Sequence, residues 1–581
     1  MPTVLRLPFL LLTMLFVYSY PLHAEDISTE AKLLGVDSSL ASALNGGLSL
    51  NRQQKSERLN KRYIEKLYQS GFEELKTMLT VYGYYDVNIT GELSHTEQVW
   101  TGTYTVKLGE PINYALIDLQ LSGEAKTDKK FQALTADFPL KVGQQLNHEK
   151  YESAKKSILK LAVSRGYFDG KLTRSEVEVD TSRQQANVYL HYDSGNRYRF
   201  GKTLFPKTVV GENLLKKLIP YEAGEYYLDS DVLTLRKNLS DSGYFDSVSV
   251  RADHKAREND TVTLDISLDE KPRQLYTASI GYGTDTGARL GLGWENRYVN
   301  NRGHRFETNA KLSQVTNTLS ADYVMPFWSN TINSVGFNTE YKQQDTDTSE
   351  SESFALGSYY KRERWGWNET GSIKMLQENF DIADENESTF LLIPGIAWSR
   401  TWADNTIYTL HGASLSLSLS GANQSLLSDI SFAQVVVRGK LIQAFGEKSR
   451  FITRASIGST QVSDFDRLPS SLRFFTGGDN SIRGFDYQSL GPEDSKGDVI
   501  GGRYLAVGSV ELEHMFIRDW GAAIFSDFGN AFNSFSDPIE YSVGIGLRWR
   551  SPVGLVRVDL AKAISETDEP IALHIVIGPD L

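Results

Sequence analysis

The tetrapeptide GYYD at Gly83–Asp86 returns as GYFD at Gly166–Asp169 and again as GYFD at Gly243–Asp246. The copies start 83 (166 − 83) and 77 (243 − 166) residues apart, which is the length of a small domain and not of a solenoid turn. A helical pattern precedes each copy, and two alternating strands follow it. Because glycine readily takes the left-handed conformation that ends a helix, we expect each copy to close a helix before a strand. The alternative is that these tetrapeptides are ordinary turns between a helix and a strand. Three copies with matching flanks favour a domain that occurs three times.

The first residues have the features of a secretory signal. Arg6 is the only early charge, Leu7–Tyr18 is an apolar run, and Leu22–Ala24 offers a cleavage site before Glu25. An apolar run of this length is too short to span a bilayer. We therefore expect residues 1–24 to be removed on export, with a buried helix as the minor alternative.

Composition excludes several classes of protein. The 581 residues include no cysteine, so neither a disulfide nor a catalytic thiol is possible. The net charge of −12 argues against a nucleic-acid partner. Mean hydropathy is −0.34 and no later segment offers 18 consecutive apolar residues, which excludes a helical membrane protein. A membrane β-barrel stays possible, because its alternating strands dilute the hydropathy signal.

From about Leu275 onwards the sequence alternates between apolar and polar residues with a period of two, which is typical of strands. In Ala413–Ser420 four apolar residues alternate with four serines, and Tyr541–Arg550 alternates in the same way. Many of these segments reach about ten residues, the length that a tilted membrane strand needs. We count sixteen, starting near residues 275, 288, 304, 318, 331, 352, 366, 388, 408, 430, 449, 503, 520, 540, 554 and 571.

The connections between these strands differ in length. Those after even-numbered strands are short, as at Asn300–Gly303 and Gly446–Lys448. Those after odd-numbered strands are often longer and acidic, as at Gln343–Ser351, Asp381–Glu387 and Ser565–Pro570. Short periplasmic turns and long outer loops are the pattern of an outer-membrane barrel with an even strand number.

One predicted loop, Ser463–Gly502, differs from its acidic neighbours. It is rich in glycine and aromatic residues, and it contains Arg483 within SLRFFTGGDNSIRGF. A loop of this length is usually functional, and its composition predicts that it folds into the barrel lumen. By alternation Glu511 and Asp527 face the lumen, so Arg483 could pair with either carboxylate.

The seam between the first and last strands is predicted to be weak. The first strand, Leu275–Gly283, carries Gly281 and Gly283. The last strand is short and ends at Gly578–Pro579, where proline cannot donate to the ladder. A client strand could add to such an edge by β-augmentation. The alternative is that the seam is only short and has no role in function.

Repeats followed by a barrel with GGDNSIRGF resemble the BamA/TamA superfamily of outer-membrane assembly factors, which consist of POTRA repeats and a barrel. The family's loop motif (V/I)RG(F/Y) is matched at Ile482–Phe485, including Gly484 and Phe485, its F-x-D-x-G motif at Phe525–Gly529, and its S-x-E motif at Ser509–Glu511. In the family the loop arginine docks on these acidic residues. The resemblance implies three β-α-α-β-β POTRA repeats at 25–109, 110–193 and 194–270 and a 16-stranded antiparallel barrel at 271–581, with 463–502 as the sixth outer loop.

The number of repeats and the amino-acid sequence of the loop are similar to those of the outer-membrane subunits of the translocation and assembly module. This resemblance implies a TamB-like, inner-membrane-anchored periplasmic partner, autotransporter and other barrel clients, and a role in outer-membrane lipid traffic. A two-partner-secretion-type transporter and a passive channel are the alternatives. An outer-membrane enzyme is disfavoured, because the nine histidines are scattered and no zinc or phosphate-loop motif occurs, so no cofactor, metal or catalytic residue is expected.

Overall fold

The computed structural model describes residues 27–56, 58–96, 99–258, 260–326, 333–383, 385–405, 408–551, 554–565 and 571–578. The chain divides into two compact units, which are residues 1–200 with 224–229 and 257–262, and residues 201–223 with 230–256 and 263–581. The signal predicted at 1–24 lies outside the described residues and stays a prediction. None of the helices in the described ranges has the length and apolar character needed to cross a membrane.

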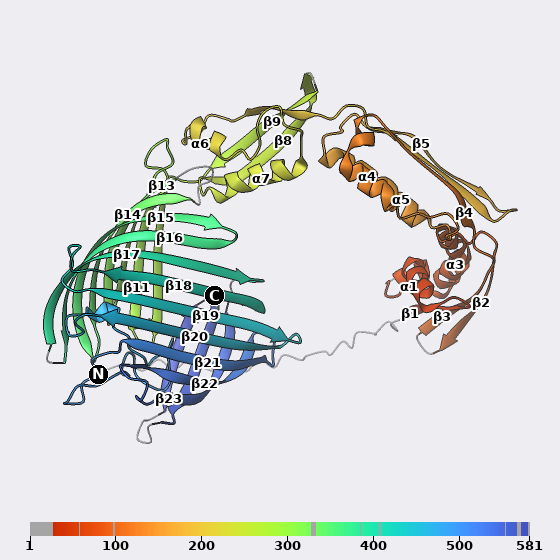
Figure 1. Ribbon diagram of the computed structural model, residues 1–581. Helices are drawn as coiled ribbons and strands as arrows, with labels where there is room; N and C mark the ends of the chain where they lie inside the picture. Colours follow the sequence, from red (N-terminus) through yellow and green to blue (C-terminus); the bar gives the residue numbers. More distant parts are fainter. Residues whose placement is uncertain are drawn as a thin grey trace, which may run out of the picture. The chain divides into compact units, whose positions relative to one another are not determined.

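The first repeat is a three-stranded sheet with helices inserted after its first strand (Figure 1). The sheet order is β1-β3-β2, with β1 parallel to β3. The α3 helix buries Leu67, Leu75 and Leu79 against the sheet, as its apolar positions recur with the period of a helix. The elements are β1 (Ser28–Leu34), α1 (Ser38–Gly47), α2 (Ser49–Arg52), α3 (Lys61–Val81), β2 (Val87–Thr96) and β3 (Val99–Leu108).

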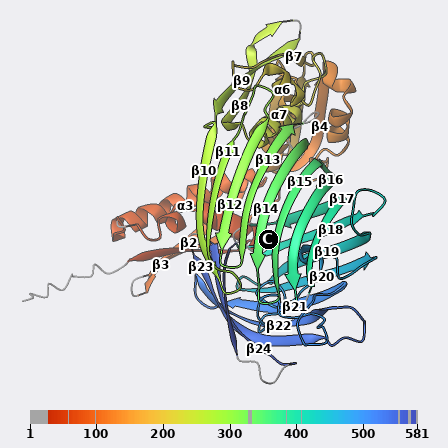
Figure 2. The ribbon, with the colours of Figure 1, turned by 90° about the vertical axis from the view of Figure 1, so that its left-hand side faces the viewer.

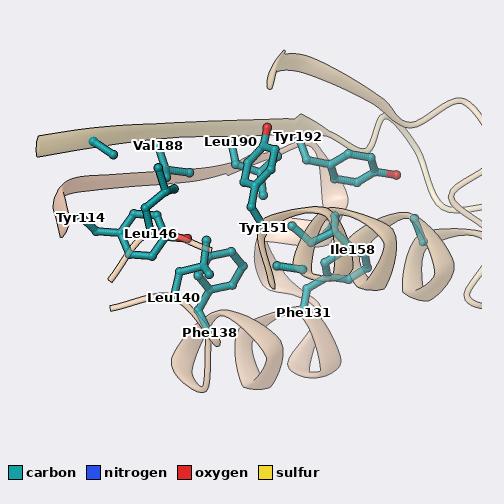
Figure 3. Packing of buried hydrophobic residues seen from close by; sticks show 14 of the residues in the cluster. Tyr114, Phe131, Phe138, Leu140, Leu146, Tyr151, Ile158, Val188, Leu190 and Tyr192 are labelled. Atoms are coloured by element: carbon teal, nitrogen blue, oxygen red, sulfur yellow. The ribbon is translucent and has the colours of Figure 1, made fainter. Parts of the chain in front are cut away.

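The second repeat has the same order, and its core is shown in Figure 3. Phe131 and Ile158 from the helices pack with Val188, Leu190 and Tyr192 of the central strand. The sheet order is β4-β6-β5, so the last strand of the repeat lies in the middle. The elements are β4 (Asn113–Ser122), η1 (Glu124–Thr127), α4 (Lys129–Ala136), α5 (His148–Ser164), β5 (Lys171–Asp180) and β6 (Gln185–Asp193).

The third repeat completes the series with the sheet order β7-β9-β8. The glycines of the three tetrapeptides have φ angles of +83°, +83° and +81°, which confirms the predicted left-handed helix ends. In this repeat Tyr244 also donates a hydrogen bond of 2.6 Å to the carbonyl of Gly303, in a turn of the barrel. The elements are β7 (Arg199–Leu204), α6 (Glu212–Lys217), α7 (Asp229–Asp241), β8 (Phe245–Glu258) and β9 (Thr261–Glu270).

Sixteen antiparallel strands follow in one sheet whose order is the order of the sequence, β10 to β25 (Figure 2). Their starts agree with the sixteen predicted starts to within three residues. The strands are β10 (Gln274–Gly283), β11 (Gly287–Asn296), β12 (Arg305–Ser313), β13 (Thr316–Pro326), β14 (Ser334–Asp345), β15 (Ser349–Arg364), β16 (Trp367–Ile382), β17 (Glu385–Ala403), β18 (His411–Ala422), β19 (Phe432–Phe445), β20 (Ser449–Val462), β21 (Tyr504–Met515), β22 (Trp520–Phe532), β23 (Glu540–Ser551), β24 (Gly554–Ala563) and β25 (Ala572–Gly578).

Two predicted loops are mostly strand. Gln343–Ser351 and Asp381–Glu387 shrink to connections of a few residues, because β14 to β17 pair across most of both ranges. The β17 strand has 19 residues, whereas about 9 to 11 span a membrane. The extra length carries polar residues on both faces, so alternation does not reveal it. The predicted contrast between short and long connections was therefore wrong at these two positions. The third predicted loop, Ser565–Pro570, falls largely outside the described residues.

The two faces of the sheet differ in burial as alternation predicts. On β23 the side chains of Val543, Ile545 and Leu547 are exposed, whereas those of Ser542 and Arg548 are buried. The exposed apolar face is the one that contacts lipid in a membrane barrel, and the buried polar face lines the lumen.

Candidate functional site

The sixth outer loop, residues 463–502, lies between β20 and β21 and is folded back onto the inner face of the sheet. Leu468 and Ile482 are fully buried, and Phe485 is almost so. A second arginine of the loop, Arg473, anchors the part of the loop that lies next to its two ends. It donates to the carbonyl oxygens of Leu468 and Ile500 at 2.9 and 3.0 Å and contacts Glu385 at 2.7 Å. The loop thus has a core and buried anchors of its own.

Arg483 lies at the centre of a charged cluster. Its Nε and Nη2 atoms donate to the two oxygens of Asp527 at 2.7 and 2.9 Å, which is a bidentate pair. Its Nη1 atom donates to Glu511 and to Asp559, both at 2.9 Å. The guanidinium carbon lies 3.4 Å from the ring centroid of Phe525. The structure therefore brings together Arg483 and both predicted carboxylates, and it adds Asp559 of β24.

The residues beside Arg483 fit the loop closely against strands β23 to β25. Gly484 has a φ angle of +99°, and a Cβ atom there would lie 3.0 Å from the backbone nitrogen of Ala563. Its own N–H donates to Nε2 of His574 at 2.9 Å. Ile482 and Phe485 pack with Ala563 in one apolar cluster. Glycine is needed here both for its conformation and for the close approach of the two backbones.

A second layer of charges supports the first. Arg548 donates to Glu511 at 2.6 Å and to Glu513 at 2.7 Å, and it also pairs with Asp559. Arg450, fully buried, pairs with Glu513 and donates to the carbonyl of Thr409 at 2.7 Å. Sequence reasoning missed this layer, although the alternation of β23 already placed Arg548 on the inner face.

Arginines and carboxylates are interleaved in this network. Four arginines contact four carboxylates, and these residues are Arg450, Arg454, Arg483 and Arg548 with Glu511, Glu513, Asp527 and Asp559. Burying a charge is costly unless it is paired and hydrogen-bonded, so removing a single member leaves its partner uncompensated. The network is consequently sensitive to single substitutions.

The seam between β10 and β25 is the other unusual feature. The two strands are the ends of the sheet order, and no strand pairing joins them within the described residues. In β10, Ile280 is 88% exposed and Tyr276 is 70% exposed, and most residues of both faces are exposed. A hydrogen bond of 3.3 Å runs from the N–H of Ile575 to Oγ1 of Thr284, just beyond the end of β10.

The predicted seam glycines have different surroundings. A Cβ atom on Gly281 would meet nothing within 4 Å, whereas one on Gly283 would meet the guanidinium of Arg289. Gly578 is the last residue of β25 and pairs with Leu555 of β24. Pro579 lies outside the described residues. An antiparallel continuation from Ile575 beside Thr284 places Gly578 beside Gly281, so most of β10 extends past the described end of β25.

Three residues near the seam have donor atoms that a divalent cation could bind. Ligand atoms of Asp285, Asp479 and His574 lie within 4.8 Å of one another. All three also take part in hydrogen bonds within the protein, and these connect the sixth outer loop to both seam strands.

In the second repeat a buried carboxylate holds the end of α5. Asp128 accepts hydrogen bonds from Arg165 at 2.7 Å and from Tyr167, in the GYFD turn, at 3.1 Å. It also caps α4 by accepting from the N–H of Lys130. Burial alone would raise the pKa of Asp128, but the hydrogen bonds from Arg165 and Lys130 outweigh it and lower the pKa.

The chain thus combines POTRA-type repeats with a 16-stranded barrel whose long loop is seated in the lumen by an arginine. The Omp85 superfamily domain model matches residues 258–578, more than half of the chain, and the chain belongs to this superfamily. The model "POTRA domain TamA domain 1" matches residues 30–108, and a model described as surface antigen variable number repeat, a POTRA family, matches 114–195 and 200–271.

Individual relatives agree with this assignment. The outer membrane protein assembly factor BamA of Neorickettsia risticii is 22% identical over 513 residues, which cover 83% of this chain and 68% of that protein. BamA of Nitratidesulfovibrio vulgaris is 38% identical over 98 residues, 16% of this chain and 12% of its own length. The crystal structure of BamA from Haemophilus ducreyi lacking POTRA domains 1–3 has a TM-score of 0.67 at 17% identity, covering 80% of this chain and 99% of that one, so the fold is shared.

Membership fixes the cellular setting. The chain is an outer-membrane protein whose POTRA repeats lie in the periplasm. Proteins of this superfamily assemble or transport other proteins without catalysing a chemical reaction.

Proposed function

We propose that this chain assists the insertion and assembly of client outer-membrane β-barrel proteins, autotransporters among them, by pairing client strands with the edge of β10. The observation that carries the proposal is that β10 has no strand paired to its outer edge within the described residues. Backbone donors and acceptors of an unpaired strand are a template for another strand. The exposure of Ile280 and Tyr276 supports access to the edge from the membrane.

The loop contacts supply the second part of the proposal. Arg483, Gly484 and Phe485, with Glu511 and Asp527, act as a lock that keeps the sixth outer loop seated while the seam works. A seated loop closes the lumen, so clients leave sideways through the seam. Gly281, Gly283, Gly578 and Pro579 are the proposed lateral seam, because residues of this kind pair weakly.

The partner is proposed from the first repeat. Its match to the TamA-type first POTRA domain supports a place in a translocation and assembly module, with a TamB-like periplasmic protein that is anchored in the inner membrane. The same seam would offer outer-membrane lipid a lateral exit. A passive channel is less well supported, because a buried loop occupies the lumen. A two-partner-secretion-type transporter is less well supported, because the first repeat matches the TamA-type POTRA model.

Photo-crosslinking tests the proposal directly. A photo-reactive residue at position 280, on the seam edge, is compared with one at position 457, which is exposed on β20 in the middle of the sheet. We expect client barrel proteins to crosslink to position 280 and not to position 457. Equal crosslinking at both positions, or none at 280 during active assembly, would contradict the proposal. Steady single-channel conductance in planar bilayers would support the passive channel instead.

A further inference from the structure

A polar cluster at the outer end of the seam adjoins the Arg483 network but has side chains of its own. It consists of Thr284 and Asp285 in the turn after β10, Asp479 in the sixth outer loop, and His574 in β25, and we call it the seam clasp. His574 and Asp479 are 4% and 7% exposed. Because β10 begins directly after the periplasmic repeats, its end at Gly283, next to Thr284, is the end remote from the periplasm.

The hydrogen bonds of the seam clasp run in a defined direction. Nε2 of His574 accepts from the N–H of Gly484 at 2.9 Å, so the ring proton is on Nδ1. Nδ1 then donates to Asp479 at 2.7 Å. The same carboxylate accepts from the hydroxyl of Thr284 at 3.1 Å, and the backbone N–H of Asp479 donates to Asp285 at 2.7 Å. Asp479 is thus the centre of the cluster.

This geometry favours a clasp over a metal site. A cation bound to Nδ1 of neutral His574 would leave the proton on Nε2. That proton would face the N–H of Gly484, and two donors would meet at 2.9 Å. The neutral imidazole with its proton on Nδ1 satisfies both neighbours without a cation.

We propose that the seam clasp fastens the outer ends of β10 and β25 to each other through the sixth outer loop. This inference rests on the proposed function of the seam. The hydroxyl of Thr284 joins the strands directly, because it accepts from the N–H of Ile575 and donates to Asp479. The side-chain partners of Arg483, by contrast, lie on β21, β22 and β24. The Arg483 network therefore seats the loop on the continuous wall, while the seam clasp closes the gap.

The consequence is that opening the seam and moving the tip of the loop are one event. A client strand that advances along β10 from the periplasmic side reaches the seam clasp last. It must break the contacts of Asp479 before β10 and β25 separate completely. Thr284, Asp479 and His574 are therefore positioning residues that set how far the seam opens.

Spin-label distances across the seam test this inference on the full chain in lipid nanodiscs. The chain has no native cysteine, so labels go only to Ile280→Cys on β10 and Ile577→Cys on β25, both exposed. Thr284→Val removes the hydroxyl and keeps the shape of the side chain. We expect the fraction of molecules with a widened seam to rise roughly tenfold, because bonds to a buried charged group are lost. Limited proteolysis should show the loop still seated.

Two further variants complete the experiment. Asp479→Ala should widen the seam, whereas Asp479→Asn should stay near wild type, because its amide oxygen still accepts from Thr284 and His574. Asp498→Ala is the control, since this aspartate of the same loop is exposed. An unchanged distance distribution in Thr284→Val overturns the seam clasp, even if Asp479→Ala widens the seam by unseating the loop. A widened seam in Thr284→Val, combined with no client crosslinking to position 280 during active assembly, would retain the seam clasp and contradict the proposed function.

Discussion

Replacing Arg483 by alanine should unseat the sixth outer loop. Its loss removes the bidentate pair and leaves Asp527 with the guanidinium of Arg454, at 3.7 Å, and the backbone N–H of residue 483, at 3.1 Å, whereas Glu511 and Asp559 keep their contacts with Arg548. The free-energy cost of the substitution therefore arises mainly at one buried carboxylate, Asp527. Breaking a buried ion pair costs about 3–5 kcal/mol. At about 1.4 kcal/mol for each factor of ten, the seated state should lose roughly two to three and a half orders of magnitude in population.

The assay is limited chymotrypsin digestion of the protein in lipid vesicles, read by mass spectrometry as cleavage after Phe485. This residue is buried in the seated loop and should be cut only when the loop leaves the lumen. Arg483→Lys should rescue poorly, because an ammonium group cannot form the bidentate pair with Asp527.

Arg467→Ala is the matched control, because Arg467 belongs to the same loop but is 38% exposed and lies 3.7 Å from its acidic partners. Exposed pairs contribute about 0–1 kcal/mol, so this variant should stay protected. Wild-type protection and client assembly in Arg483→Ala would refute the reasoning.

Three further results are expected. Gly484→Ala should expose the loop to protease and cost about 1–3 kcal/mol, because its φ angle of +99° strains any side chain and the backbone of Ala563 is too close. Glu513→Gln should lower the thermal stability of the barrel, measured as heat-modifiable mobility on gels, because two buried arginines lose their shared carboxylate. Asp128→Asn should speed hydrogen exchange of α5 in the full chain, at a cost of about 1–3 kcal/mol near neutral pH. Because its folded pKa is lowered, the contribution of Asp128 is present above its unfolded pKa of about 3.9 and is lost as the pH falls through the folded pKa, so variant and wild type should converge in acid.

Local patterns predicted the fold well. A glycine that needs a positive φ angle and strands that alternate between lipid and lumen are constraints of neighbouring residues, so they are visible in the sequence. The long strands β15 to β17 were missed at their ends, because polar residues on both faces of a strand carry no alternation.

The candidate site was only partly predictable. Alternation placed Glu511 and Asp527 in the lumen and left the choice between them open, whereas Arg483 contacts both, together with Asp559. Contacts between distant parts of the chain have no local signature. His574 looked like one of several scattered histidines, and only the folded loop brings Asp479 to within 2.7 Å of it.

Crosslinking the seam tests the central claim most directly. Tyr282→Cys with Ile577→Cys spans β10 and β25 at the register set by Ile575 and Thr284, and a disulfide requires Cα atoms about 5.5 Å apart. Ile524→Cys with Ile545→Cys is the control, since these residues face each other on the paired strands β22 and β23. Both oxidised proteins should stay folded. The account predicts that only the seam disulfide stops client assembly and that reductant restores it; full assembly activity in the quantitatively crosslinked seam variant would contradict it.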